Sequence, residues 1–324
     1  MVRLPDFYVV GAPKCGTTSL YCYLRQHAGL FMPEVKEPNF FCSDFASIQK
    51  FKTVEDYSKL FTSARESQLI GEASPWYLYS KSAIQNILGV QPNAKFIVML
   101  RNPVDAVISH FNYMRYFLVE DREDILEAVA LEDRGMERKA ALRHRHAKPF
   151  LNYKGLFSYS EQIARIKKLV PAENMLVVFF EEFFQNPAQN FPKITNFLNL
   201  PQQNISFEAH NQAKEWRFDF VRKFIVNQSS APQRVIVEVL RFLKNHNINI
   251  RDMILNSLSR DGESQSVDAT TRALLQSMFA EDVKALKEML QLPSSSAWDG
   301  VGIATIRQGS TAPRPISTFE PVLG

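Results

Sequence analysis

The chain has 324 residues, which is enough for about two domains at roughly 150 residues each, or for one large α/β domain with a tail. It is 45% hydrophobic and 22% charged, with 12 glycines and 17 prolines, so collagenous, low-complexity and mostly disordered classes are excluded. The 38 lysine and arginine residues exceed the 34 acidic residues by only four. A dedicated nucleic-acid-binding protein is therefore not expected, and any bound anion should be small.

The sequence also indicates the cellular compartment of the protein. No apolar run reaches the roughly 18 residues that cross a bilayer, and the first residues do not build a signal-peptide core. Cys15, Cys22 and Cys42 form an odd set in one short stretch, unlike the disulfide framework of a secreted protein. We therefore expect a cytoplasmic protein without a membrane partner.

The hydrophobic pattern predicts strands and helices that alternate along the chain. Short apolar runs indicate buried parallel strands, because each is separated from the next by enough residues for a helix. In the last predicted helix an apolar stripe begins at Leu274 and ends at Leu290. The predicted strands are residues 7–10, 68–71, 95–100 and 175–180, and the predicted helices are residues 16–27, 104–116, 159–170, 187–198 and 271–290.

The C-terminal end differs from the rest of the chain. Residues 300–324 mix Gly, Ser, Thr and Pro without periodicity, which is typical of a linker or extension. We expect one domain over residues 1–299 and a linker over residues 300–324.

Residues 11–19, GAPKCGTTS, stand between the first predicted strand and helix, where backbone N–H groups and the helix dipole can hold a phosphate. A nucleoside-triphosphate loop has a lysine directly after its second glycine. Here Thr17 follows Gly16, and the lysine is Lys14, inside the loop. By itself such a segment could be an ordinary connection. Lys14 can still reach a phosphate or a bridging oxygen, so the segment predicts a phosphate site that differs from an ATPase loop.

A second cationic position follows the strand predicted over residues 95–100. Arg101 comes directly after that strand, whereas a metal-dependent P-loop enzyme usually has an acidic residue at a strand end to help hold Mg²⁺. Ser109 lies eight residues later, just over two helical turns away. Arg101 and Ser109 could meet one phosphate if the chain turns between them. No metal is expected, because the close pair His144 and His146 lacks a Cys or acidic partner at ligand spacing.

These motifs resemble the sulfotransferases that use 3′-phosphoadenosine-5′-phosphosulfate (PAPS). PKCGTTSL is similar to their 5′-phosphosulfate loop and LRNPVDAVISHF to their 3′-phosphate segment. The similarity includes PEVKEPNFF, GEASPWY, YKGLFSYSEQI and NMLVVFFEEFFQNP, and it extends to SSAWDG. The resemblance implies an α/β, P-loop-type three-layer fold with a central parallel sheet flanked by helices. It also implies a PAPS-dependent sulfotransferase closest in motif pattern to the heparan-sulfate-type and bacterial enzymes.

The resemblance assigns the donor-binding residues. Lys14 would contact the 5′-phosphate and the oxygen that bridges it to sulfur. Arg101 and Ser109 would hold the 3′-phosphate, the group that distinguishes PAPS from ATP. The remaining donor-binding residues of the loop and helix start would be Cys15, Gly16, Thr17, Thr18 and Ser19.

The resemblance also suggests the base. In the heparan sulfate branch a glutamate ahead of a Phe-Phe pair accepts the acceptor proton, and Glu37 in KEPNFF has that position. Glu37 and Lys14 are therefore the predicted catalytic residues, although a Glu in a loop is most often a solvated carboxylate. Lys36 could favour ionised Glu37 or contact substrate. The branch often has a His and a Lys where this chain has Asn39 and Ala73, which argues against a polysaccharide acceptor.

The acceptor is the least determined feature. The basic segment over residues 134–148 has two interpretations. The preferred one is a solvated helical face, and the alternative is a lid or docking surface for an acidic acceptor. The chain also resembles sulfotransferase domains of bacterial polyketide synthases. That resemblance implies a β-hydroxyacyl chain on an acyl carrier protein as acceptor, with neighbouring synthase domains as partners. A free small molecule or a glycan remains an alternative acceptor.

Two other functional classes stay open from the sequence. One is an ATP-dependent phosphotransferase, against which the positions of Lys14 and Arg101 both count. The other is a non-catalytic nucleotide-binding module that keeps the phosphate loops. His110, next to Ser109, is expected to pack or to support neighbouring groups.

Overall fold

The computed structural model describes residues 3–117, 119–133, 148–208, 213–216, 259–262, 267–292 and 298. Residues 134–147 of the basic segment, with His144 and His146, lie outside the described residues, and so do residues 300–324. Expectations about those two segments therefore stay predictions.

The centre of the structure is a five-stranded sheet in the order β2-β3-β1-β4-β5, with every pairing parallel. It confirms the predicted parallel sheet and adds β2, which is too short to show a hydrophobic pattern. A separate antiparallel pair joins β6 to β7. The strands are β1 Phe7–Gly11, β2 Leu30–Phe31, β3 Leu69–Ala73, β4 Lys95–Leu100, β5 Met175–Phe179, β6 Ala213–Trp216 and β7 Ser259–Gly262.

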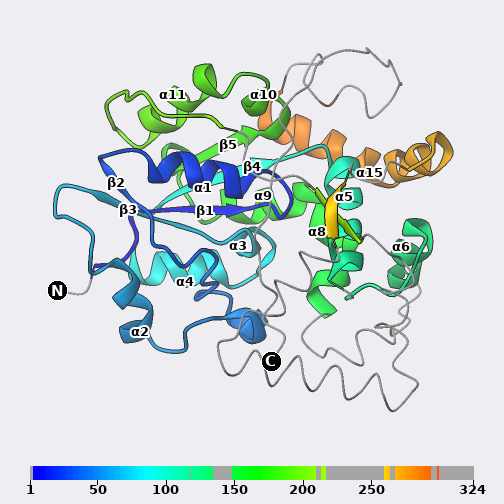
Figure 1. Ribbon diagram of the computed structural model, residues 1–324, viewed down its shortest axis with the longest axis horizontal. Coiled ribbons are helices and arrows are strands. Elements are labelled where there is room, and N and C mark those ends of the chain that lie inside the picture. Colours follow the sequence, from blue (N-terminus) through cyan, green and yellow to red (C-terminus); the bar gives the residue numbers. More distant parts are fainter. Residues whose placement is uncertain are drawn as a thin grey trace.

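Helices cover both faces of the sheet, which confirms the three-layer α/β fold. In Figure 1, α2 to α4 lie on one side of the strands and α10 and α11 on the other. Short 3₁₀ helices span Ser43–Ile48, Lys59–Phe61, Lys148–Leu151 and Ala172–Asn174. The α-helices are α1 Thr17–Arg25, α2 Val54–Ser58, α3 Trp76–Tyr79, α4 Ala83–Val90, α5 Pro103–Tyr116, α6 Ile125–Asp133, α8 Tyr153–Phe157, α9 Tyr159–Lys167, α10 Phe180–Gln185, α11 Pro187–Phe197 and α15 Ala269–Leu290.

The two central strands are apolar along their length because both of their faces are covered. Every residue of β1 is buried, as are all residues of β4 after Lys95. A register shift between Val9 and Gly11 places an extra residue in β1 just before the loop that follows it. The loop therefore leaves the sheet at the carboxyl end of β1, the edge where parallel α/β sheets hold ligands.

Helix α15 joins the C-terminal part of the described chain to this core. Leu275, Phe279, Val283 and Leu286 are buried, at the spacing of one helix face. Leu274 is 51% exposed, so its inclusion in the predicted stripe was wrong. An adjacent helical residue is rotated by about 100°, which turns Leu274 away from the face that Leu275 occupies.

Candidate functional site

The loop after β1 and the start of α1 form the first part of the site (Figure 1). Gly16 precedes α1 with φ 82°, a left-handed conformation that favours glycine, and a Cβ there would collide with the Phe184 ring. The predicted residues Thr17, Thr18 and Ser19 are all buried in the first turn of α1. Backbone N–H groups of a first turn have no partner inside the helix, so this end of α1 can hold an anion.

Lys14 lies inside the loop with φ 63°. Its Nζ is 4.1 Å from the ring centroid of Tyr113, on α5. Burial and, to a smaller extent, the nearby Arg101 charge lower the pKa of Lys14 to about 7, whereas the charge of Glu37 opposes the shift. The fold thus holds a desolvated amine, which a bound anion would favour in its charged form, where the sequence predicts a phosphate group. The helical pattern alone gave no reason to select Tyr113.

Arg101 follows β4 directly and reaches the same loop. Its Nη1 donates to the Lys14 carbonyl oxygen at 3.4 Å, and its guanidinium lies 4.6 Å from the ring centroid of Phe180. Its Nε is buried and has no hydrogen-bond partner in the described part of the chain. A buried N–H normally has a partner, so an anion beside Arg101 would satisfy it.

Ser109 is half-buried on α5, one helical turn before Tyr113. The two side chains therefore lie on one face of the helix, and Tyr113 places that face against Lys14. Among the described residues no hydrogen bond joins Ser109 to Arg101. The structure thus brings Arg101 to Lys14, and it leaves the shared 3′-phosphate role of Arg101 and Ser109 a prediction.

Glu37 reaches the site from the segment after β2. It is buried, with 7% of its surface exposed, and its backbone N–H donates to the Ala73 carbonyl at the end of β3 at 3.1 Å. Lys36 Nζ contacts Glu37 Oε1 in an ion pair that is largely shielded from water. Glu37 is therefore not a solvated loop carboxylate. Of the two roles open to Lys36, the structure displays the contact with Glu37.

Asn39 and His110 are supporting residues. Asn39 is fully buried, with φ 50°, and its Nδ2 donates to the Glu37 carbonyl oxygen at 3.1 Å. His110 is buried with its Nε2 2.8 Å from the Phe150 carbonyl oxygen, and burial lowers its pKa to about 3. A neutral, packed imidazole agrees with the packing role expected for His110.

Cys15 lies in the loop but faces the protein interior. Its Sγ is 3.6 Å from the Tyr159 hydroxyl oxygen, and burial raises the pKa of the thiol to about 12. Its backbone N–H donates to the Ala12 carbonyl at 3.3 Å. In this structure Cys15 therefore shapes the loop, and its role in donor binding stays a prediction.

Glu181 and Trp298 support the Arg101 turn, and no spacing pattern in the chain predicts either contact. Glu181, in α10, accepts from the Asn102 N–H on Oε1 at 2.8 Å and from Trp298 Nε1 on Oε2 at 3.0 Å. Burial raises the pKa of Glu181, and these two hydrogen bonds oppose the rise. Both residues stand in motifs, FFEEFF and SSAWDG, that the resemblance includes.

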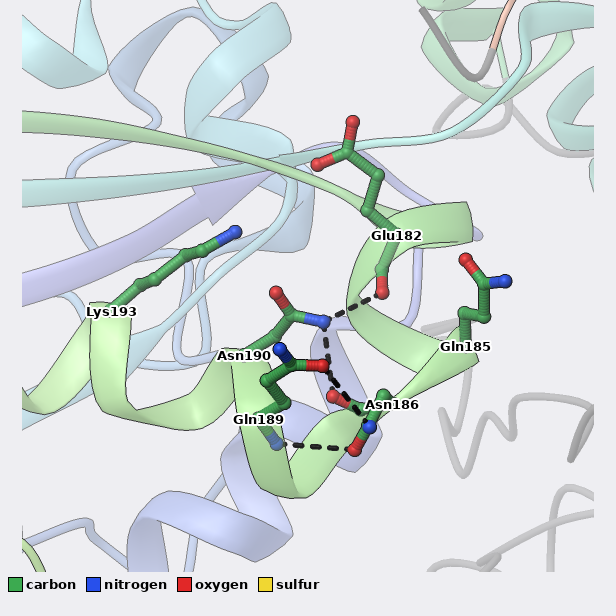
Figure 2. Close-up of a pocket in the computed structure, with 6 residues that line it drawn as sticks. All are labelled: Glu182, Gln185, Asn186, Gln189, Asn190 and Lys193. Carbon is green, nitrogen blue, oxygen red and sulfur yellow. Dashed lines mark hydrogen bonds between the residues drawn. The ribbon is translucent and has the colours of Figure 1, made fainter.

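A pocket of about 680 Å³ lies between α10 and α11. Figure 2 shows its polar lining, in which Asn190 Nδ2 donates to the Glu182 carbonyl oxygen and Asn186 Oδ1 accepts from the Gln189 backbone N–H. These bonds hold the turn between the two helices. The lining residues are Glu182, Gln185, Asn186, Gln189, Asn190 and Lys193, and they include none of the predicted site residues.

Two further searches cover only the described ranges. No cluster of three or more His, Cys, Asp or Glu side chains there could hold a metal ion. In the same ranges no helix has the length and apolar character to span a bilayer.

Comparisons with known proteins agree with these motifs. The model of the sulfotransferase domain family matches residues 4–251. The membrane-associated sulfotransferase kil1 of Dictyostelium discoideum is 34% identical over 130 residues, 39% of this chain and 26% of that protein. Carbohydrate sulfotransferase 15 of Homo sapiens is 27% identical over 257 residues, 64% of this chain and 46% of that protein. The chain thus spans less than half the length of these two curated relatives.

A solved structure shows the same fold. The sulfotransferase from Alicyclobacillus acidocaldarius aligns with a TM-score of 0.64 at 24% identity, covering 92% of this chain and 100% of that one. The family match covers most of the chain and includes the loop, the Arg101 turn and the Glu37 segment. The chain therefore belongs to the sulfotransferase domain family.

Proposed function

We propose that this protein transfers the sulfuryl group of PAPS to an acceptor hydroxyl. The observation that carries the proposal is the convergence of the half-buried Lys14 and Arg101 and the buried Glu37 at one loop on the carboxyl edge of the sheet. Two cations and a helix start suit a donor with two separate phosphate groups. The third group, Glu37, suits the removal of a proton from the acceptor.

The fit of PAPS rests on features of the loop itself. Gly16 allows the left-handed turn that begins α1 close to the Phe184 ring, and the buried Arg101 Nε needs an acceptor. In the proposed arrangement Lys14 and the α1 start bind the 5′-phosphosulfate, and Arg101 with Ser109 binds the 3′-phosphate. Cys15, Thr17, Thr18 and Ser19 complete the loop contacts.

The proposed reaction is an in-line transfer between two oxygens. The bond between sulfur and the bridging phosphate oxygen breaks, and a bond between sulfur and the acceptor oxygen forms. Glu37 accepts the hydroxyl proton, and Lys14 stabilises the negative charge that develops on the leaving phosphate oxygen. The ion pair with Lys36 keeps a charged Glu37 tolerable in a setting with little water.

Two kinds of acceptor follow from different observations. The basic segment over residues 134–148 and the polyketide-synthase resemblance support a β-hydroxyacyl chain on an acidic acyl carrier protein. The relative named carbohydrate sulfotransferase 15 supports a carbohydrate hydroxyl instead. We propose the carrier-bound chain first, because Asn39 stands where the heparan branch often has a His, and here it holds the Glu37 segment from a buried position.

The first test separates PAPS chemistry from ATP chemistry. Calorimetric titration with 3′-phosphoadenosine-5′-phosphate (PAP), ADP and ATP should show at least a ten-fold preference for PAP, because only PAP carries the 3′-phosphate. The variant K14A should bind PAP more weakly. Equal affinity for PAP and ADP would refute the donor assignment and favour a general nucleotide-binding module.

The second test concerns the base. Release of PAP from PAPS is measured with 3-hydroxyacyl pantetheine thioesters and with an unsulfated glycosaminoglycan. Glu37→Gln should lower kcat by roughly 10²- to 10⁴-fold, the range for loss of a general base, and should leave PAP affinity unchanged. Glu34→Gln is the matched control, since Glu34 is an exposed carboxylate three residues earlier. Full turnover by the Glu37 variant would refute this role.

A further inference from the structure

The segment that carries Glu37 is held in an unfavourable backbone conformation. Glu37 has φ 55° and Asn39 has φ 50°, and both are residues with a Cβ in the left-handed region. Such conformations persist only where surrounding contacts determine them. The hydrogen bond from Asn39 Nδ2 to the Glu37 carbonyl oxygen lies within the segment, and further contacts come from outside it.

Residues 48–50 supply some of the outside contacts, and the end of β3, Ser74 and α3 supply three more. The Ala73 carbonyl accepts from the Glu37 N–H at 3.1 Å, and Ser74 Oγ accepts from the Asn39 N–H at 3.1 Å. The Tyr77 hydroxyl oxygen accepts from the Phe41 N–H at 3.4 Å. Three successive anchors thus hold the strained backbone against β3 and α3.

The Tyr77 hydroxyl is itself oriented by a buried carboxylate. Glu72 is fully buried in β3, and its Oε2 accepts from the hydroxyls of Tyr57 and Tyr77, each at 2.8 Å. Because the Tyr77 proton points to Glu72, the tyrosine oxygen presents a lone pair to the Phe41 N–H. Glu72 therefore fixes the direction of the hydrogen bond that anchors the segment.

We propose that Tyr77 and Glu72 are positioning residues for Glu37. Both side chains are fully buried, and the Tyr77 hydroxyl bonds Glu72 and the Phe41 N–H, so the pair acts through the segment. It fixes the backbone that carries the Glu37 carboxylate relative to Lys14. The kinetic part of this inference rests on the proposed function, whereas the structural part does not.

Tyr57 supplies a matched control. Tyr57 and Tyr77 donate to the same Glu72 oxygen at the same distance, and both rings are fully buried. Only the Tyr77 hydroxyl also accepts a backbone N–H of the Glu37 segment. Y57F and Y77F therefore remove the same group from the same acceptor, and only Y77F also removes the anchor to the Phe41 N–H.

The first measurement is amide hydrogen exchange of the full chain, resolved at Phe41. Y77F should raise the exchange rate of the Phe41 amide at least ten-fold, and Y57F should change it less than two-fold. E72L should resemble Y77F, and E72Q should restore protection because a glutamine oxygen can still accept from both hydroxyls. Equal Phe41 exchange in Y57F and Y77F would overturn the proposal.

The second measurement is kinetic, with the acceptor that supports turnover in the panel above. Y77F should lower kcat at least ten-fold while the KM for PAPS and the Kd for PAP change less than two-fold. Y57F should retain kcat within two-fold of the wild type. A kcat for Y77F equal to that of Y57F would overturn the proposal. Failure of the wild type to bind PAP would instead refute the proposed function, and the exchange comparison would still decide the anchor.

Discussion

Burial of Lys14 makes its charge depend on pH close to neutrality. The pKa of about 7 means that, at pH 8, Lys14 is neutral in most molecules of the unliganded protein. A bound phosphate favours the charged ammonium, so binding above pH 7 must take up a proton. The affinity for PAP should therefore fall as the pH rises above 7, by up to about ten-fold per pH unit.

Calorimetry between pH 6.5 and 8.5, in buffers of different ionisation enthalpy, measures both the affinity and the proton uptake. Lys14→Arg is the control, because a guanidinium stays charged and should flatten the profile. Glu72 also has a pKa raised to about 7 by burial, and phosphate groups titrate at about pH 6, so a slope that persists in the arginine variant would come from Glu72 or from PAP itself. An affinity independent of pH would contradict the prediction for Lys14.

At the scale of elements, α15 caps the start of α9. Asp282 accepts from the backbone N–H of Tyr159 at 2.7 Å and of Ser160 at 3.0 Å, and it also contacts the Ser160 hydroxyl. D282A should lower the free energy of unfolding by about 1–3 kcal/mol, since charge-assisted bonds at a helix start are lost. Urea denaturation measures the change. The exposed neighbour Glu281 is the control, and an equal loss in E281A would contradict the capping role.

Elements with a strong hydrophobic pattern could be predicted, and short ones could not. Strands β1 and β4 are continuous apolar runs because both faces are buried, and their predicted positions are confirmed. Strand β2 has two residues, and α3 has four, so neither spans enough residues to show a period.

The site was predictable where one motif contained it. Lys14 and Arg101 each follow a strand, and parallel strands bring their carboxyl ends to one edge, so their proximity follows from the sequence pattern. Tyr113 and Glu181 act through contacts between elements that lie far apart in the chain, and Glu72 contacts hydroxyls 5 and 15 residues away on other elements. Such contacts cannot be predicted from the spacing of residues within one element. The family resemblance identified motifs but did not assign these roles.

At the scale of the whole molecule, the Glu181 carboxylate joins the C-terminal part of the described chain to the turn after Arg101, at the carboxyl edge of the sheet. Trp298 is 2% exposed and packs its ring 5.0 Å from Phe179, and its Nε1 donates to Glu181, which also holds the turn after Arg101. Each oxygen of Glu181 accepts from one N–H donor. Because the two donors reach different oxygens, a glutamine would turn an NH2 group toward one of them and would lose that hydrogen bond.

E181Q should therefore weaken PAP binding by about 3- to 10-fold, or roughly 0.7–1.4 kcal/mol, because the Arg101 turn loses part of its support. W298F, which keeps a ring but loses the N–H donor, should weaken binding in the same direction. Calorimetric titration measures both, with E182Q as the control on an exposed neighbour. If E181Q and W298F lower the melting temperature but leave PAP affinity equal to that of E182Q, the contact holds the fold together without shaping the donor site.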